Sequence, residues 1–247
     1  MKTKLSLAFF LLFFMILTAI SAGMPNRSIR ILVITGGHDY NKASFAKMLT
    51  SLGNEISFEI IELPAAYDMF QPENRDKYDV LVFYHMWQTI TDEQEKMLAD
   101  CIRKGKPLVV LHHSICAFDN WDEYIHIVGG KYFHHVTTIH GIEYPASSYE
   151  DDRYILIKVI DTVHPVTKGL KDFELFDETY KDYYLEPGIK PLLQTDDSTS
   201  VPVIGWTAQY GKSRVVTIQP GHDTPTFQDN NYQRLLLQAI LYVYKGN

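Results

Sequence analysis

Four short apolar runs in this sequence each end on a histidine. These histidines are His38, His85, His112 (with His113 directly after it) and His222. Histidine titrates near neutral pH and is the most common metal ligand in proteins, so it suits both proton transfer and metal binding. A single histidine at the end of a strand often only caps a carbonyl group. Four of them from unrelated segments indicate one shared functional site.

The apolar runs must be buried strands if they are to bring these histidines together. Short β-branched runs that alternate with helical segments are typical of parallel strands in a doubly wound α/β sheet. Strands are expected at 29–35, 56–63, 80–84 and 108–111, and helices at 41–51 and 91–104. Thr91 and Gln94 form a capping-box pattern at the start of the second helix. Ligands of such sheets bind outside the carboxyl ends of the strands, where the histidines would lie.

The second half of the chain follows a different pattern. The segments 64–77 and 132–145 lack a clear period. The first is expected to be a loop and the second an irregular insert with His134, His135 and His140. A short helix is expected within 119–128. An antiparallel or edge strand is expected at 154–160, further short strands at 173–176 and 192–195, and a hairpin formed by 201–207 and 213–218. An amphipathic helix at 230–244 closes the fold. The predicted fold class is therefore α/β: a mostly parallel sheet flanked by helices, with an antiparallel β addition.

Residues 1–22 have the pattern of a secretory signal peptide. Lys2 and Lys4 precede an apolar stretch at 5–20, and the small residues Ser21-Ala22-Gly23 follow it. The pattern predicts a secreted or periplasmic protein with a single domain at 23–247, and an uncleaved membrane anchor is the alternative. Once the signal is removed, no remaining stretch is long and apolar enough to predict a membrane span.

Charge and cysteine content narrow the choice of partners. The formal charge is −7 without any compensating basic cluster, which argues against nucleic acid as a partner. An acidic chain rich in aromatic residues fits a neutral polar small molecule such as a carbohydrate. Cys101 and Cys116 are expected to be free and buried, with a disulfide between them as the alternative. No feature of the sequence predicts an oligomeric state.

Several motifs in order resemble the ThuA-like, or trehalose-utilisation, family, over about residues 29–243. They are Gly36-Gly37-His38-Asp39-Tyr40, Gly105-Lys106-Pro107 through His113, the segment 164–170, Asp177-Glu178-Thr179-Tyr180, and the segments 202–206 and 211–216. The resemblance implies a class I glutamine amidotransferase-like fold, with a flavodoxin-like sheet. It also implies a role in carbohydrate utilisation, on keto-sugars or their glycosides.

Comparison with true amidotransferases suggests which residues carry the chemistry. Their nucleophilic cysteine follows a strand similar to 105–111, and here the next residue is His112. Their catalytic histidine lies in a segment similar to 219–223, which here contains His222. The resemblance therefore implies that this chain has the catalytic histidine, at His222, and a histidine in place of the nucleophilic cysteine, at His112. A thiol-dependent amidotransferase is excluded at this position, and Cys116 is a poor substitute.

Two mechanisms fit a pair formed by His112 and His222. In the first, the pair binds a divalent metal such as zinc, with His38 or His113 as a third ligand and a carboxylate from Asp39, Asp223 or Glu178. In the second, the two histidines act as general acid and base, each oriented by a carboxylate, with Glu178 as the candidate for His222. Both mechanisms remain open at this stage.

The expected ligand contacts complete the hypothesis. Tyr84, Trp87 and Tyr180 are candidates for stacking on a sugar ring, and Asp39, His113 and Asp223 for polar contacts with the substrate. The first functional hypothesis is an enzyme that acts on a sugar as a hydrolase, lyase or isomerase. The alternative is a non-catalytic sugar-binding module that kept the crevice and lost the nucleophile.

Overall fold

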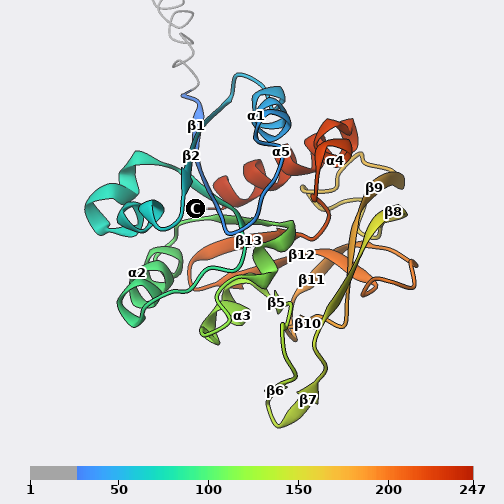
Figure 1. Cartoon of the computed structure of the whole chain (residues 1–247). Helices are drawn as coiled ribbons and strands as arrows, with labels where there is room; N and C mark the ends of the chain where they lie inside the picture. Colours follow the sequence, from blue (N-terminus) through green and yellow to red (C-terminus); the bar gives the residue numbers. More distant parts are fainter. Residues whose placement is uncertain (1–26, 247) are drawn as a thin grey trace, which may run out of the picture.

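A nine-stranded sheet forms the centre of the computed structural model, which describes residues 27–246 (Figure 1). The strand order is β2-β1-β3-β4-β13-β12-β11-β8-β9. The segment predicted to be a signal peptide, residues 1–22, lies outside the described residues. Within 27–246, every helix is too short or too polar to cross a bilayer.

The first five strands of this order are all parallel. They are β1 (Ile29–Gly36), β2 (Ile56–Glu62), β3 (Val80–His85), β4 (Leu108–Leu111) and β13 (Ser213–Ile218). Their bounds differ from the predicted ones by no more than one residue. Strands β1, β3, β4 and β13 are nearly continuous buried apolar runs, whereas β2 is a largely exposed strand at the edge of the sheet. The carboxyl ends of these strands therefore form one edge, as the alternation of strands and helices predicted.

The remaining strands form the antiparallel addition. They are β12 (Val203–Tyr210), β11 (Lys190–Gln194), β8 (Ser148–Val159) and β9 (Phe173–Lys181). Strands β8 and β9 extend well beyond the predicted 154–160 and 173–176. The sequence did not reveal these extensions because they are polar: the added part of β9 contains Asp177 and Glu178, which are buried.

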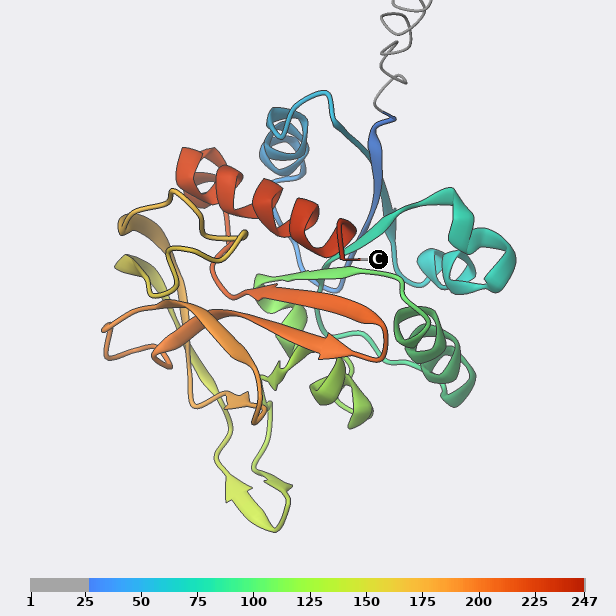
Figure 2. The same ribbon diagram turned by 180° about the vertical axis from the view of Figure 1, so that it is seen from behind.

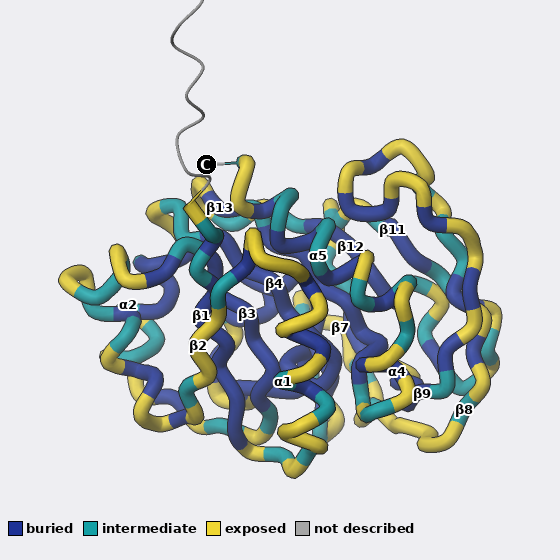
Figure 3. The backbone as a smooth tube through the Cα atoms, turned by 90° about the horizontal axis from the view of Figure 1, so that it is seen from above, coloured by how far each residue is buried: buried dark blue, intermediate teal, exposed yellow. Residues whose placement is uncertain are grey.

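Helices cover both faces of the sheet (Figures 1 and 2). One apolar core packs α1 (Lys42–Ser51), α4 (Thr224–Gln228) and α5 (Asn230–Tyr244) against one face. A second core packs α2 (Asp92–Arg103) and α3 (Glu123–Val128) against the other. Successive strand residues alternate between these two cores. Figure 3 shows the buried strands between exposed outer segments.

The segment expected to be a loop at 64–77 is instead ordered into two 3-10 helices, η1 (Ala65–Phe70) and η2 (Pro72–Lys77). The prediction was wrong because proline at the first position of a helix is compatible with helical geometry. Tyr67 and Phe70 of η1 are buried against α2, and this packing holds the turn in place.

The insert is also partly ordered. Strand β5 (Gly130–Lys131) pairs with β10 (Tyr184–Leu185), and β6 (Thr137–Ile139) pairs with β7 (Ile142–Tyr144). The hairpin formed by β6 and β7 projects from the body of the molecule (Figure 1). A short 3-10 helix, η3 (His112–Cys116), directly follows β4 and begins at the predicted site.

Candidate active site at the carboxyl edge of the sheet

Three of the predicted histidines meet beyond the carboxyl ends of the parallel strands. His38 follows β1, His112 follows β4, and His222 lies on the loop after β13. The ring centroid of His222 is 5.2 Å from that of His112 and 5.8 Å from that of His38. The fold therefore brings these side chains into one cluster, for the reason that the strand pattern predicted.

The backbone at His112 is strained. Its φ of 48° lies in the left-handed region, where a non-glycine residue costs about 1–3 kcal/mol. The imidazole is fully buried, and its Nδ1 lies 2.8 Å from the carbonyl oxygen of Gln219. Because a carbonyl oxygen can only accept, Nδ1 must donate, and this contact assigns the tautomer of a neutral ring. The lone pair of His112 Nε2 is then directed toward the rest of the site.

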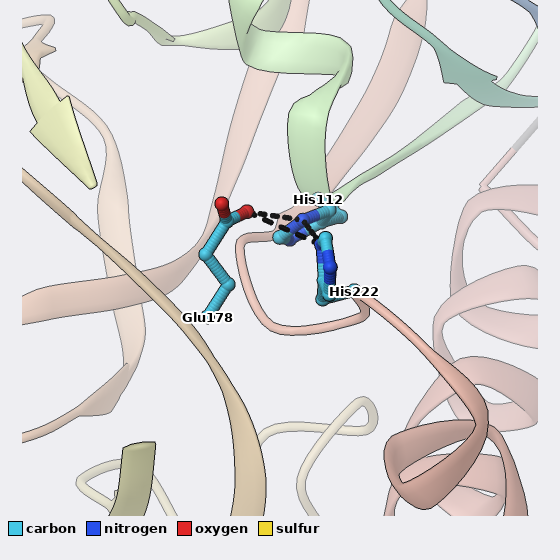
Figure 4. A group of neighbouring side chains, drawn as sticks. All are labelled: His112, Glu178 and His222. Carbon is cyan, nitrogen blue, oxygen red and sulfur yellow. Dashed lines mark hydrogen bonds and ion pairs between the residues drawn. The ribbon is translucent and has the colours of Figure 1, made fainter. Parts of the chain in front are cut away.

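Glu178 on β9 joins the two histidines (Figure 4). Its Oε2 atom is 2.9 Å from His112 Nε2 and 3.4 Å from His222 Nδ1. The two ring nitrogens are 3.2 Å apart. Burial alone would raise the pKa of Glu178, but hydrogen bonds with His112 and His222 outweigh it and hold this pKa well below its usual range. Glu178 is therefore an ionised carboxylate at neutral pH.

Asp177, which the sequence analysis did not select, fixes the loop that carries His222. Its buried carboxylate accepts hydrogen bonds from the backbone N–H groups of Gly221 (2.8 Å) and His222 (3.0 Å). It also accepts one from the Thr226 hydroxyl at 2.7 Å. Adjacent residues of a strand point to opposite sides, so Asp177 holds the loop while Glu178 faces the histidines.

His222 is the most exposed member of the triad formed by His112, Glu178 and His222. Its side chain is 31% exposed, whereas that of His112 is 0% exposed. The hydrogen bond with Glu178 raises the pKa of His222, and burial opposes that effect. Gly221 before it has a φ of 138°, and a Cβ there would lie 2.4 Å from the Tyr232 hydroxyl. Glycine is therefore required where the loop turns toward the sheet.

A cavity of about 630 Å³ opens beside the triad. This volume is within the usual range for small-molecule sites. Its lining includes Glu178, His222 and His38 from the cluster, together with the predicted Trp87 and Tyr180. Aromatic and polar side chains from the antiparallel addition and the insert complete the walls: Tyr132, His134, His135, Ser147, Tyr149 and Asp151.

Asp151 is a second residue that the sequence analysis missed. The pairing of β8 with β9 skips from Glu150 opposite Thr179 to Arg153 opposite Asp177. This bulge leaves Asp151 and Asp152 beside Glu178, and Asp151 lines the cavity. Burial and the nearby Glu178 charge raise the pKa of Asp151. Bulges often redirect side chains next to active sites. No pattern of residues in this sequence predicts the bulge at Asp151.

Two predicted contacts with substrate are wrong. Tyr84 and His113 lie behind the cluster, with 1% of each residue exposed. The Tyr84 hydroxyl donates to the carbonyl oxygens of Gly221 and His222, so it supports the loop from within the core. The His113 ring packs against His38 and Tyr84, and burial holds its pKa well below its usual range.

Asp39 and Asp223 are exposed and do not line the 630 Å³ cavity. Asp223 instead lines a neighbouring hollow of about 300 Å³, together with Asp151 and His222. The fourth strand-end histidine, His85, is wholly buried against Phe83 and Phe118. Neither of its ring nitrogens has a hydrogen-bond partner within residues 27–246. His85 is therefore a core residue rather than a member of the cluster.

One of the exposed aromatic residues that line the cavity, Trp87, stacks on a histidine ring of the insert. Trp87 is 55% exposed, and its indole stacks on the His134 ring with centroids 3.7 Å apart. The Nε2 atom of His134 lies 3.1 Å from the Cys116 carbonyl oxygen. The insert thus contributes to the cavity wall through both His134 and His135.

Both cysteines are free and buried, as expected. Cys116 is at the end of η3, four residues after His112, and is among the residues that line the cavity. Burial raises the pKa of this thiol well above its usual range. Because the thiolate is the nucleophilic form, the environment of Cys116 opposes covalent catalysis.

Comparison with solved structures finds similar folds. A ThuA-like protein from Parabacteroides merdae is 20% identical, with a TM-score of 0.74 over 90% of this chain and 91% of that one. One from Bacteroides uniformis is 18% identical, with a TM-score of 0.67 over 90% and 94% of the two chains. A glutamine amidotransferase from Thermotoga maritima is 10% identical, with a TM-score of 0.53 over 89% and 99%. At these identities the likeness shows the fold alone.

Comparison by sequence gives the family. A search of curated proteins finds no match. The model of the family described as "ThuA: Trehalose utilisation" matches residues 30–243, which is most of the chain. The motifs that suggested this family lie within the matched range and include His112 and Glu178, and His222 lies within the matched range as well. The chain therefore belongs to the ThuA family of trehalose utilisation, on a glutamine amidotransferase-like α/β fold.

Proposed function

We propose that this protein is an enzyme that acts on a keto-sugar or a glycoside, with the triad His112, Glu178 and His222 as its reacting centre. The observation that carries the proposal is the convergence of two imidazoles and an ionised carboxylate on one point beside a cavity of about 630 Å³. Such groups can exchange a proton with a bound molecule near neutral pH. The reaction class is a hydrolase, lyase or isomerase.

The cavity supports a carbohydrate as the substrate. Its walls combine rings, from Trp87, Tyr132 and Tyr149, with polar groups such as Ser147 and Asp151. Sugars present apolar ring faces and hydroxyl groups, which suit this mixture of aromatic surface and hydrogen-bonding side chains. The description of the family, trehalose utilisation, supports the same class of substrate.

The location follows from the sequence pattern of residues 1–22. A signal peptide there would direct the protein to a secreted or periplasmic location, where sugars and glycosides are met before uptake. The proposed ligand is a neutral small molecule. The acidic net charge supports neither nucleic acid nor an anionic membrane surface as a partner.

A non-catalytic sugar-binding module is the competing function. The observation that favours it is the exposed aromatic surface at the cavity mouth, where Trp87 is 55% and Tyr149 57% exposed. Binding alone, however, does not require a buried carboxylate between two imidazoles or the strained backbone at His112. Those features favour the enzyme.

The experiment compares turnover with binding in the wild type and in His112→Asn. The panel contains keto-sugars, keto-glycosides and the unoxidised glycosides. We expect turnover of at least one member, and a decrease of roughly 10²-fold or more in kcat for the variant, with little change in substrate affinity. His126→Gln, at an exposed histidine that does not line the cavity, is the control. Wild-type protein that binds sugars and turns over no member of the panel would establish the binding module instead.

A further inference from the structure

We propose that His112, Glu178 and His222 bind one divalent metal ion, and that the ion is of the zinc type. The inference locates the metal at the reacting centre of the proposed function and so rests on it for its role in chemistry. Metal binding itself is measured without any substrate. The three side chains come from three separate elements, the end of β4, strand β9 and the loop after β13, so only the folded chain assembles the site.

The distances between the donor atoms match a metal site. His112 Nε2, Glu178 Oε2 and His222 Nδ1 form a triangle with sides of 2.9, 3.2 and 3.4 Å. In a tetrahedral zinc site with bonds of about 2.0–2.1 Å, neighbouring ligand atoms are about 3.3 Å apart. The triangle in this structure is therefore close to one face of such a tetrahedron, slightly compressed along the side that joins His112 to Glu178.

The hydrogen-bond pattern shows why a cation belongs at this point. His112 Nδ1 donates to the Gln219 carbonyl, so the Nε2 lone pair of the neutral ring is directed at Glu178 and His222. Glu178 is a carboxylate and can only accept. A single proton shared among these three atoms can satisfy one contact at a time, whereas a metal ion accepts all three lone pairs at once. Metal-binding histidines usually donate their other N–H to a carbonyl or carboxylate, as His112 does.

The donor set selects the ion. Two imidazole nitrogens and one carboxylate oxygen are the ligands of several catalytic zinc sites, which keep a fourth position for water or substrate. His112 and Glu178 are buried, but His222 is half-buried and lines the cavity, so the fourth position faces the cavity. A water molecule bound to zinc there would have its pKa lowered to about 7. It would supply the base or nucleophile for the proposed reaction.

Neighbouring groups support a positive ion. Asp177 and Asp151 add negative charge near His222, and Asp177 also fixes the His222 backbone through its N–H group. Tyr180 contributes a hydroxyl 2.9 Å from His112 Nε2, and this hydroxyl is also within reach of Glu178. With the metal in place, the lone pair of Nε2 is used for coordination and the Tyr180 hydroxyl donates to the carboxylate instead.

Direct metal titration tests the proposal. The protein is purified without a histidine tag, treated with a chelator, dialysed and titrated with Zn²⁺ by calorimetry, with elemental analysis of the product. We expect about one ion per chain. Substitution of a ligand, in Glu178→Gln or His222→Asn, should weaken binding by roughly 100-fold. His126→Gln is the matched control and should bind like the wild type, because His126 lies on the surface beside Glu186. Co²⁺ provides a second probe, since a tetrahedral site gives intense visible absorption that the ligand variants should lose.

The outcomes distinguish this inference from the proposed function. Wild-type protein that binds neither Zn²⁺ nor Co²⁺, or Glu178→Gln protein that binds them as tightly as the wild type, would overturn the metal site. Full sugar turnover by metal-free protein would overturn the role of the metal in the reaction, while leaving the enzyme in place. One tightly bound ion without turnover of any sugar would support the metal site and reject the proposed substrate class. Because the wild-type stoichiometry needs no variant, misfolding of a variant does not weaken the test.

Discussion

The carboxylate of Asp177 accepts a hydrogen bond of 3.0 Å from the backbone N–H of His222, across 45 positions of the chain. Asp177 therefore sets the position of the His222 backbone without a hydrogen bond to the His222 imidazole. Its neighbour Glu178 contacts the His222 imidazole directly. Two consecutive residues of β9 thus control both the backbone and the ring of His222, and this arrangement connects the antiparallel addition to the parallel sheet.

Asp177→Asn should separate positioning from chemistry. The amide nitrogen cannot accept the N–H and hydroxyl donors that now meet the carboxylate, so the loop should lose its fixed geometry. We expect sugar turnover, and metal affinity if the metal site holds, to fall between about 10- and 100-fold, as for other residues that orient a ligating group. We also expect a loss of about 2–4 kcal/mol in the free energy of unfolding, measured by urea titration.

Two further variants show whether the loss comes from His222. Thr226→Val removes one hydrogen bond to Asp177 and leaves its charge in place, so it should destabilise the protein with a smaller effect on turnover. Asp196→Asn, at an exposed carboxylate, should change neither property. If Thr226→Val reduced turnover as much as Asp177→Asn at matched stability, Asp177 would be a structural residue only.

How much of this site the sequence predicts depends on the element that carries each residue. His38, His112 and His222 follow buried apolar strands, and the strand pattern places all three at one edge. Glu178 was found only through the resemblance to the family, because β9 was predicted to end at residue 176. Its polar continuation is buried by contacts with segments far away in the chain, and such burial leaves no local pattern.

Side-chain direction explains why Tyr84 was wrongly predicted to contact the substrate. Tyr84 is on β3 and belongs to the core beneath α1 and α5, whereas its neighbour Phe83 belongs to the opposite core. Side chains along β3 alternate between the two cores, so Tyr84 points into the core. The sequence alone could not predict which side chains at the end of β3 face the cavity, because that depends on the strand register. Asp151 required the bulge in β8, and Asp177 required the fold of the loop after β13.

Gly221→Ala should disturb the centre through its backbone. The new Cβ would lie 2.4 Å from the Tyr232 hydroxyl and 3.4 Å from the Cβ of His112. A φ of 138° also strains any residue with a side chain. We expect a loss of about 1–3 kcal/mol in the free energy of unfolding and reduced turnover.

A double-mutant cycle with Tyr232→Phe isolates the steric part. Tyr232→Phe removes the clashing hydroxyl and its hydrogen bond to the Pro220 carbonyl. The double variant should therefore be destabilised by less than the sum of the two single variants. Strict additivity would show that the clash is relieved elsewhere and that backbone strain alone excludes alanine.

Cys116→Ser should leave turnover nearly unchanged. His112 stands where amidotransferases keep their thiol, and burial keeps the Cys116 thiol protonated. We expect slow alkylation of the native protein and a change of no more than about twofold in kcat. Cys101→Ser is the control, because Cys101 is equally buried but lies beside Tyr78, away from the cavity. Loss of turnover by folded Cys116→Ser protein, with Cys101→Ser active, would restore a covalent mechanism.

The last prediction concerns stability in acid, and it depends on His85. Burial lowers the pKa of His85 to about 3, from an ordinary value near 6.5. Between these two values the unfolded chain binds a proton that the folded chain does not bind, so stability must fall as the pH is lowered. The slope reaches about 1.4 kcal/mol per pH unit, so about 2 kcal/mol is lost at pH 5 through this one group. His113, whose pKa burial also lowers, adds a loss of the same sign that is shared by the wild type and the variants below.

Replacement of His85 by an apolar residue should remove its part of this loss. His85→Phe and His85→Leu leave the packing against Phe83 and Phe118 apolar and delete two ring nitrogens that have no partner within residues 27–246. Urea titrations at pH 8 and pH 5 give the free energy of unfolding of each protein. Between these pH values the decrease should be about 2 kcal/mol smaller for each His85 variant than for the wild type, whatever the stability of the variant at pH 8. Ile240→Val, in the apolar core on the opposite face of the sheet from Phe83 and Phe118, changes no titratable group and should run parallel to the wild type. Parallel stability curves for the wild type and both His85 variants would mean that His85 is protonated in the folded protein, in contradiction to its apolar burial.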